Sequence, residues 1–229
     1  DSSTYIPPNK HIGKSETLCI LKGEIQLFFF NDFGGCFDSL ILSAEKSEHP
    51  FLVRIPPNTW HGLRVISETN CIIKETISGP YSSESLAWAD FAPSENENKS
   101  NNSGFKYYEE LGSRENSKSN KSRSSSLLRI NDNVLLSTNQ IPTISKNDCI
   151  ILRDMADKSL LKRARICLHS SNTDQLQDML IYLGPECDID ISYHINKDES
   201  LVVMQGNGSY NFYDNEGNVC ATVNLQNFE

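Results

Sequence analysis

Apolar and polar residues alternate along the first ninety positions, in short runs that turn residues separate. In residues 24–30 every second side chain is apolar on one face, and Asn-Asp and Gly-Gly pairs then break the pattern. Three further runs have the same character, at residues 36–45, 51–67 and 70–78. A period of two residues with few helical patterns is typical of antiparallel strands. Residues 1–92 are therefore expected to form a sandwich or barrel.

Residues 93–126 lose this alternation. They are rich in Ser, Asn, Glu and Lys and contain few apolar side chains. Such a composition cannot bury enough surface to offset chain ordering, so we expect a flexible linker. Within it the stretch FKYYEELG, residues 105–112, suits either a transient helical turn or a small docking motif on a tether.

The apolar signal returns at Leu127. Residues 148–171 have the pattern of a short helix followed by a strand, and residues 174–184 favour a strand. Residues 188–225 are again strand-like.

The last segment repeats the beginning of the chain without a gap, at an offset of 183 positions. His11, Glu16 and Gly23 correspond to His194, Glu199 and Gly206. Further identical residues correspond at Lys14 and Lys197, Leu18 and Leu201, Phe29 and Phe212, Gly34 and Gly217, and Leu42 and Leu225. The chain therefore holds two copies of one module.

The repeat divides the chain into copy one at residues 1–92, the linker at 93–126, and the leading part of copy two at 127–229. Both copies look incomplete: copy one has no counterpart of residues 128–187, and copy two stops before a counterpart of residues 54–65. Because an open sheet edge seeks a partner, residues 128–187 could complete the sheet of copy one, either within the chain or between chains of a homodimer.

Two clusters of polar residues could meet inside such a barrel. Asn9 and His11 stand two apart, so they face the same side of a strand. A short turn then returns Glu16 on a neighbouring strand. A Pro-Pro-Asn turn delivers His61 at the start of another strand.

These clusters resemble the two cupin motifs. Asn9-x-His11-x4-Glu16-x6-Gly23 is similar to the first, and Pro56-x-Asn58-x2-His61 is similar to the second. More narrowly, the chain resembles the WbuC-type cupin-fold metalloproteins of bacterial surface-polysaccharide gene clusters. The stretches that carry this resemblance are YIPPNKH, IPPNTWH, KETISGPY, WADFAPSE, KRARICLHSS and MLIYLGPE. It implies an all-β cupin fold (a double-stranded β-helix or jelly roll), here as a tandem repeat with both copies incomplete.

The resemblance implies a metal site made of His11, Glu16 and His61. Two imidazoles and one carboxylate suit a divalent Fe, Mn or Zn ion with positions open to water or substrate. Asn9 stands where the cupin motif has its first His, and it is either a weaker ligand or a group that contacts a bound water. A hydrogen-bonded polar cluster without metal is the alternative.

Three other polar groups are candidates for a role. Copy two has Ser192 in the first-His position, so His194 and Glu199 alone are a poor metal site. Glu75 alternates with Ile73 and Ile77, and on an inward face it is a candidate catalytic acid or base, or a carboxylate paired with an Arg. His169 is expected to be structural rather than substrate-facing.

Composition narrows the functional classes. The 229-residue chain has a formal charge of −9, which gives no reason to expect nucleic-acid binding. No apolar run is long enough to span a membrane. The seven Cys residues are odd in number and form no CxxC pair, which favours reduced thiols in the cytoplasm. There is no initiator Met or signal-peptide pattern, so the chain is expected to be a fragment.

Three functions remain open. The first is a metal-dependent cupin acting on a sugar or nucleotide-sugar, by isomerisation, epimerisation or a related proton transfer. The second is a non-catalytic sugar- or metabolite-binding module, which the altered positions Asn9 and Ser192 favour. The third is an Fe(II) dioxygenase, suggested by the two-His-one-carboxylate set.

Overall fold

The structure, a computed structural model, describes residues 4–116, 125–187 and 189–227. It is mostly β-sheet, with 39% of residues in strands and 16% in helices, and none of the sheets closes on itself within these ranges. The predicted all-β character is confirmed at this level. The chain divides into two compact units, Asp1–Asp188 and Ile189–Glu229, which are described separately.

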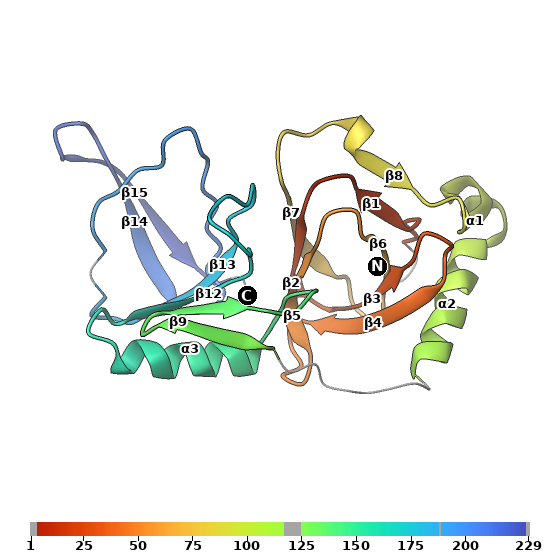
Figure 1. The fold of residues 1–229 in the computed structure, drawn as a ribbon, viewed down its shortest axis with the longest axis horizontal. Helices are drawn as coiled ribbons and strands as arrows, with labels where there is room; N and C mark the ends of the chain where they lie inside the picture. Colours follow the sequence, from red (N-terminus) through yellow and green to blue (C-terminus); the bar gives the residue numbers. More distant parts are fainter. Residues whose placement is uncertain (1–3, 117–124, 188, 228–229) are drawn as a thin grey trace. The chain divides into compact units, whose positions relative to one another are not determined.

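Two antiparallel sheets form the first half of the larger unit (Figure 1). The five-stranded sheet has the order β4 (Cys36–Ser43), β3 (Glu24–Phe30), β6 (Trp60–Val65), β1 (Asn9–His11) and β8 (Leu86–Trp88). The four-stranded sheet has the order β11 (Thr143–Ser145), β5 (Pro50–Ile55), β2 (Glu16–Lys22) and β7 (Ile72–Ile77). One short 3-10 helix, Ser83–Ser85, precedes β8.

The inward faces of both sheets share one hydrophobic core. Alternate residues of β3 enter it from one side, and alternate residues of β2 and β5 enter it from the other. The fully or nearly buried members are Leu18, Ile20, Ile25, Leu27, Phe29, Leu40, Leu42, Val53, Ile55 and Ile141. This layering is compatible with a jelly-roll-like architecture.

The late part of the chain adds a strand to this fold. Strand β11 pairs antiparallel with β5, with Thr143 opposite Val53. The expectation that residues 128–187 could complete the sheet of copy one is thus confirmed for one strand, and the pairing lies within the chain.

The remaining strands of this region form a separate sheet covered by one helix. Its order is β13 (Met179–Leu183), β12 (Arg163–Cys167), β10 (Val134–Ser137) and β9 (Leu127–Asn131), with β10 and β12 parallel. Helix α3 (Lys146–Lys158) packs on it. The short helix followed by a strand that the pattern at residues 148–171 predicted is confirmed by α3 and β12. Cys19, Phe51 and Leu52 from the first half share a second core with Ile144 and Leu152. The predicted domain boundary after residue 126 is therefore wrong, because this core joins both sides of it.

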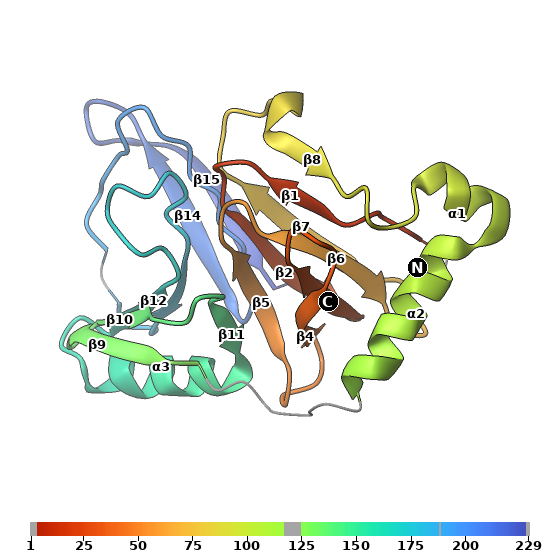
Figure 2. The same ribbon diagram turned by 45° about the vertical axis from the view of Figure 1, so that its right-hand side comes forward.

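The predicted linker is wrong for most of its length. Helices α1 (Glu95–Asn101) and α2 (Ser103–Asn116) occupy it, while residues 117–124 lie outside the described ranges. Ser94 and Glu97 form a capping box that starts α1. Helix α2 then lies along the outer face of the five-stranded sheet (Figure 2). This segment forms helices because its few aromatic side chains pack on the sheet, although its average composition is polar.

Those aromatic side chains form a third cluster. Strand β3 turns Phe28 and Phe30 outward, and both are almost fully buried. The ring of Phe30 contacts the rings of Phe91 and Tyr107. The rings of Phe28 and Tyr108 stack at 5.4 Å, and the Tyr108 hydroxyl donates a hydrogen bond to the Ile6 carbonyl. The helix is thereby fixed to the sheet by packing.

The smaller unit contains one hairpin, β14 (Asn207–Tyr213) and β15 (Val219–Gln226). Its register repeats that of β3 and β4 at the offset of 183 throughout, including a bulge at Phe212/Tyr213 that matches one at Phe29/Phe30. Gly206 and Gly217 have positive φ, as Gly23 and Gly34 do. Residues 189–206 form no strand, contrary to the expectation for 188–225. Among the described residues 189–227 there is no counterpart of β5 or β7 with which residues 189–206 could pair.

No helix in the described ranges is long and apolar enough to cross a membrane. All seven cysteines fall within those ranges, and no disulfide links them.

The contact between α2 and β6 yields a test. A Cβ atom at Gly62 would overlap the Tyr108 hydroxyl oxygen and lie 3.1 Å from its Cζ. We expect Gly62→Ala to destabilise the fold by about 1–3 kcal/mol through overpacking, measured by urea unfolding. In a Tyr108→Phe background the clash is relieved, so the two changes together should cost less than their sum. Strictly additive losses would contradict this packing, and Glu110→Ala on the exposed face is the neutral control.

Candidate functional site

Three predicted metal ligands converge between the two sheets. His11 ends β1, Glu16 begins β2 and His61 follows the first residue of β6. One possible ligand atom from each lies within 4.8 Å of the other two. The Glu16 Oε2 atom is 3.0 Å from His61 Nε2 and 3.4 Å from His11 Nε2. Glu16 and His61 are buried, and His11 is partly buried.

Strand pairing explains why the side chains meet. In β1 Asn9 stands opposite His61 of β6, and His11 follows two residues later on the same face. The chain then turns through Gly13, which has a φ of 69° that favours glycine. Glu16 enters the opposite sheet directly after this turn, so its carboxylate faces both imidazoles.

Asn58 ties the two ligand-bearing loops together. Its side-chain oxygen accepts a hydrogen bond from the backbone amide of Gly13 at 3.0 Å. The backbone amide of Asn58 donates a hydrogen bond to the His11 carbonyl at 2.9 Å. Its φ of 60° lies in the left-handed region, which Asn adopts more readily than most residues other than glycine. The sequence did not predict its bond to Gly13, because the two residues are far apart in the chain. An Asn in a Pro-Pro-Asn turn three residues before a candidate ligand His is the local signal that the sequence offers.

A backbone carbonyl orients His61. The Thr59 carbonyl lies 2.9 Å from His61 Nδ1, and because a carbonyl can only accept, Nδ1 carries a proton. In the neutral ring Nε2 is then the bare nitrogen, and it is the atom that faces Glu16. Metal-binding histidines are commonly oriented by such a second hydrogen bond.

The charges of the site are coupled. Burial alone would lower the pKa of His61, but the 3.0 Å contact with Glu16 and the negative charge of Glu16 outweigh burial and raise it. Burial would likewise raise the pKa of Glu16, but its close contact with His61 lowers it. Burial lowers the pKa of His11, so this ring favours its neutral form. Without a metal, Glu16 and His61 therefore form a buried ion pair.

The donor set fits a divalent metal ion. Glu16 Oε2 is buried and has no hydrogen bond of proper geometry, although two ring nitrogens face it. A carboxylate oxygen in that position is costly to leave unsatisfied. A metal ion would satisfy it together with both nitrogens, and binding would displace the proton held by His61.

Glu75 adds a second carboxyl group beside the triad. It stands opposite Leu18 in the pairing of β7 with β2, which places it diagonally to Glu16 on the inward face. The residue as a whole is exposed, but its carboxyl group lies close enough to feel the charge of Glu16. Partial burial of this group and the charge of Glu16 raise the pKa of Glu75 to about 7. The charged neighbours that act on it are Glu16 and His61 rather than an Arg.

Asn9 lies on the face that His11 and His61 share, and it is half-buried. A role for it as a ligand remains a prediction. In copy two, His194 Nε2 and Glu199 Oε2 are 3.8 Å apart and both side chains are about half exposed. Ser192 is exposed as well, and no third histidine, cysteine or carboxylate joins this pair within the described residues.

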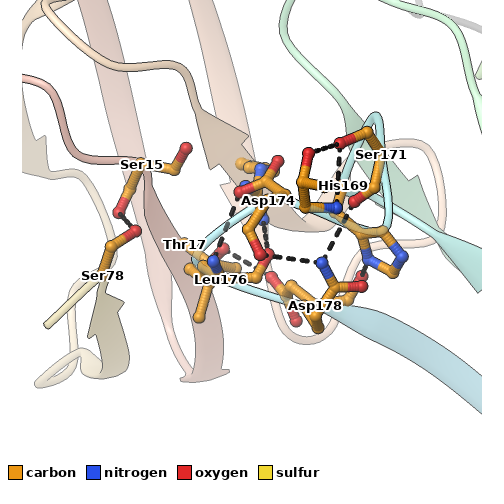
Figure 3. A network of polar contacts seen from close by, with 11 residues as sticks. Ser15, Thr17, Ser78, His169, Ser171, Asp174, Leu176 and Asp178 are labelled. Atoms are coloured by element: carbon orange, nitrogen blue, oxygen red, sulfur yellow. Dashed lines mark hydrogen bonds and ion pairs between the residues drawn. The ribbon is translucent and has the colours of Figure 1, made fainter.

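His169 belongs to a structural network on the outer side of β2 and β5 (Figure 3). The ring is buried, and Nδ1 lies 3.0 Å from the Asp178 carbonyl. The Asp178 carboxylate accepts from the Thr17 hydroxyl, and buried Arg54 forms a 2.8 Å ion pair with Asp174. This supports the structural interpretation of His169, because its ring contacts Asp178 in the segment whose side chains bind Thr17 of β2 and Arg54 of β5.

Replacing Asn58 tests how the two loops are tied. Asn58→Gly keeps the left-handed backbone but loses the acceptor for the Gly13 amide, so we expect a loss of about 1 kcal/mol in unfolding free energy. Asn58→Ala should lose roughly 1 kcal/mol more, since a Cβ strains this backbone region. Asn58→Asp keeps an acceptor and is the matched control. Wild-type stability of Asn58→Gly would contradict a role for the bond.

The Glu75 carboxyl predicts a pH dependence of the metal-free protein. Its folded pKa lies above the unfolded value, so its contribution to stability is full at low pH and is lost as pH rises through 7. In EDTA, the wild type should therefore lose about 1 kcal/mol relative to Glu75→Gln between pH 5 and 8, allowing for solvent exposure. Urea unfolding at both pH values measures this. Parallel pH curves for the two proteins would contradict it, and Glu48→Gln at an exposed site is the control.

Comparison with protein families gives one match. A family described as "Domain of unknown function (DUF6016)" matches residues 144–225. The match covers less than half of the chain, from β11 to β15, and leaves His11, Glu16 and His61 outside it. Comparison with curated proteins gives no match.

Proposed function

We propose that the first half of this protein is a cupin-type site that binds a divalent transition metal and acts on a small sugar or nucleotide-sugar. The observation that carries the proposal is the convergence of one carboxylate and two imidazoles within 4.8 Å, around a carboxylate oxygen without a hydrogen bond. On this proposal the two matching hairpins belong to a tandem cupin repeat.

His11, Glu16 and His61 would hold the metal. Two nitrogens and one oxygen suit Fe, Mn or Zn in the divalent state and leave positions for water or a substrate oxygen. Asn9, on the face that His11 and His61 share, would contribute a neutral amide oxygen or hold a water beside them. An amide is a weaker donor than imidazole, so the site is expected to bind its metal less tightly than a site with three histidines.

Glu75 would supply the proton chemistry. A bound divalent metal polarises a carbonyl or hydroxyl oxygen of a substrate. The Glu75 carboxyl stands beside Glu16 at the same end of the core, and it can take up or release a proton near neutral pH. A proton-transfer reaction such as isomerisation or epimerisation uses both features. The choice of a sugar rests on the resemblance to WbuC-type proteins alone, which is an argument by association.

A second candidate is an Fe(II) dioxygenase, which the same two-His-one-carboxylate set favours. Oxygen uptake by the Fe(II)-loaded protein would favour this reaction over proton transfer. In a thermal-shift panel of sugars and nucleotide-sugars, stabilisation with turnover supports the enzyme, and stabilisation without turnover indicates a binding module.

Metal binding is tested directly by titration. After stripping with EDTA, the wild type should bind about one equivalent of Zn²⁺ or Mn²⁺ and gain about 2.7 kcal/mol of stability at a hundred times its Kd. His61→Ala removes one of three ligands and should weaken binding at least tenfold. His49→Ala, which removes a histidine outside the triad, is the matched control. Calorimetry and elemental analysis measure both quantities.

Equal metal content in wild type and His61→Ala would refute the assignment of the ligands. Metal content below about a tenth of an equivalent in the wild type would refute the metal-dependent functions altogether.

A further inference from the structure

The chain has two tryptophans, and their surroundings differ. Trp60 of β6 lies on the outer face of the five-stranded sheet, where its Nε1 donates a hydrogen bond to the Asp32 carboxylate at 3.0 Å. Its ring is 5.5 Å from the ring of Phe91, and Lys10 Nζ lies 4.4 Å from it. Trp88 ends β8, and 53% of it is exposed. None of the three hydrophobic clusters described above includes Trp88, so core packing does not account for it.

Strand pairing places Trp88 on the face that carries the metal triad. Residues directly opposite each other in antiparallel strands project from the same face of the sheet. Asn9 of β1 lies opposite His61 on one side and opposite Trp88 on the other. His61 in turn lies opposite Phe29, which belongs to the first core. Trp88 therefore projects from the inner face, two strands away from His61, and about 10 Å separates the two backbones.

Backbone hydrogen bonds fix β8 beside β1 (Figure 1). The Ala89 amide donates to the Pro8 carbonyl at 2.9 Å, and the Ile12 amide donates to the Ser85 carbonyl at 2.8 Å. These bonds close both ends of the short pairing. The indole of Trp88 is thus carried by a paired strand, and side chains on paired strands are held more precisely for ligand binding than those on loops.

The chemistry of this neighbourhood suits a ligand with one apolar face and a polar rim. Small-molecule sites combine apolar and aromatic surface with a few convergent polar groups. A half-exposed indole supplies the apolar surface, and Asn9, His11, Glu16 and His61 supply the polar groups. The ring of a hexopyranose has both properties, because its C–H groups cover one face and its hydroxyl groups project around the edge. Its apolar face is shielded from water when it lies on an aromatic ring.

We propose that Trp88 is the stacking platform of a sugar-ring subsite beside the triad. The apolar face of a hexopyranose lies on the indole, and the hydroxyl groups at the edge of the same ring face Asn9 and the metal ligands. Trp88 is then a positioning residue that selects a pyranose ring over an acyclic polyol. This inference rests on the function proposed above, and it adds the residue that would hold the sugar.

Each tryptophan can be observed alone, because the chain has only two. In the Zn²⁺-loaded Trp60→Phe variant, all tryptophan emission comes from Trp88, and acrylamide should quench it readily. At least one of UDP-glucose, UDP-galactose and GDP-mannose should lower the acrylamide quenching constant about twofold and shift the emission to shorter wavelength. In the Trp88→Phe variant, Trp60 reports on the outer face, and its emission should stay unchanged. UDP and GDP alone should protect neither ring.

Substitution of Trp88 measures its contribution to binding. Trp88→Ala should weaken binding of the protecting nucleotide-sugar at least about tenfold in calorimetry, because the stacking surface is lost. Trp88→Tyr keeps an aromatic ring and should recover most of the affinity, which a loss of folding would not explain. The urea midpoint and Zn²⁺ content of each variant are measured alongside. Phe33→Ala is the matched control, because Phe33 is a 94% exposed aromatic residue in the turn between β3 and β4, at the opposite edge of this sheet.

Four results would overturn the proposal. All three nucleotide-sugars could leave Trp88 as accessible to acrylamide as before. UDP or GDP could protect Trp88 as well as the matching nucleotide-sugar, which would assign the indole to the base or the phosphates. Trp88→Ala could bind with wild-type affinity, or Trp88→Tyr could bind as weakly as Trp88→Ala.

Failure of the metal site is recognised separately. It appears as a wild-type chain that takes up no Zn²⁺ before any nucleotide-sugar is added, and it would remove the proposed function together with this subsite. Normal Zn²⁺ uptake combined with any of the four results above would overturn the role of Trp88 alone.

Discussion

Strand β3 is buried on both of its faces, and much of the larger unit follows from that constraint. Its inward residues require the opposing sheet, and its outward residues Phe28 and Phe30 require the helix α2. A strand with apolar side chains on both faces cannot lie at the surface of a simple two-layer fold. The larger unit covers both faces of β3 with three layers: the sheet of β11, β5, β2 and β7, then the five-stranded sheet that contains β3, and then helix α2 (Figure 2).

The candidate metal site is built on the same framework. Strand β6, which lies beside β3, carries His61 opposite Phe29, and β1 beyond it carries His11. The opposing sheet contributes Glu16 at the end of the core, where burial strengthens its interaction with both imidazoles. The three candidate ligands come from three strands and two sheets and are thus held by backbone pairing rather than by flexible loops. The hydrogen bonds of Asn58 tie the turns that carry them together.

The sequence predicted features with a short period or a fixed spacing. The alternation predicted the strands, the His and Glu spacing predicted the triad, and the offset repeat anticipated two hairpins in the same register. The sequence did not predict features that depend on contacts between residues far apart in the chain. The polar average of residues 93–126 concealed Tyr108, whose burial against Phe28 makes a helix stable there. The domain boundary failed because Ile144 packs with Phe51, a contact that no local pattern encodes.

Strand β11 has a consequence for synthesis of the protein. Ile55 ends β5, and Ser145, which ends the strand that covers its edge, follows 90 residues later. At ordinary rates of translation these residues leave the ribosome about 5–20 seconds apart. During that interval the nascent chain exposes the edge next to the turn that carries His61. Until β11 emerges, the unpaired edge of β5 is open to pairing with strands of other chains.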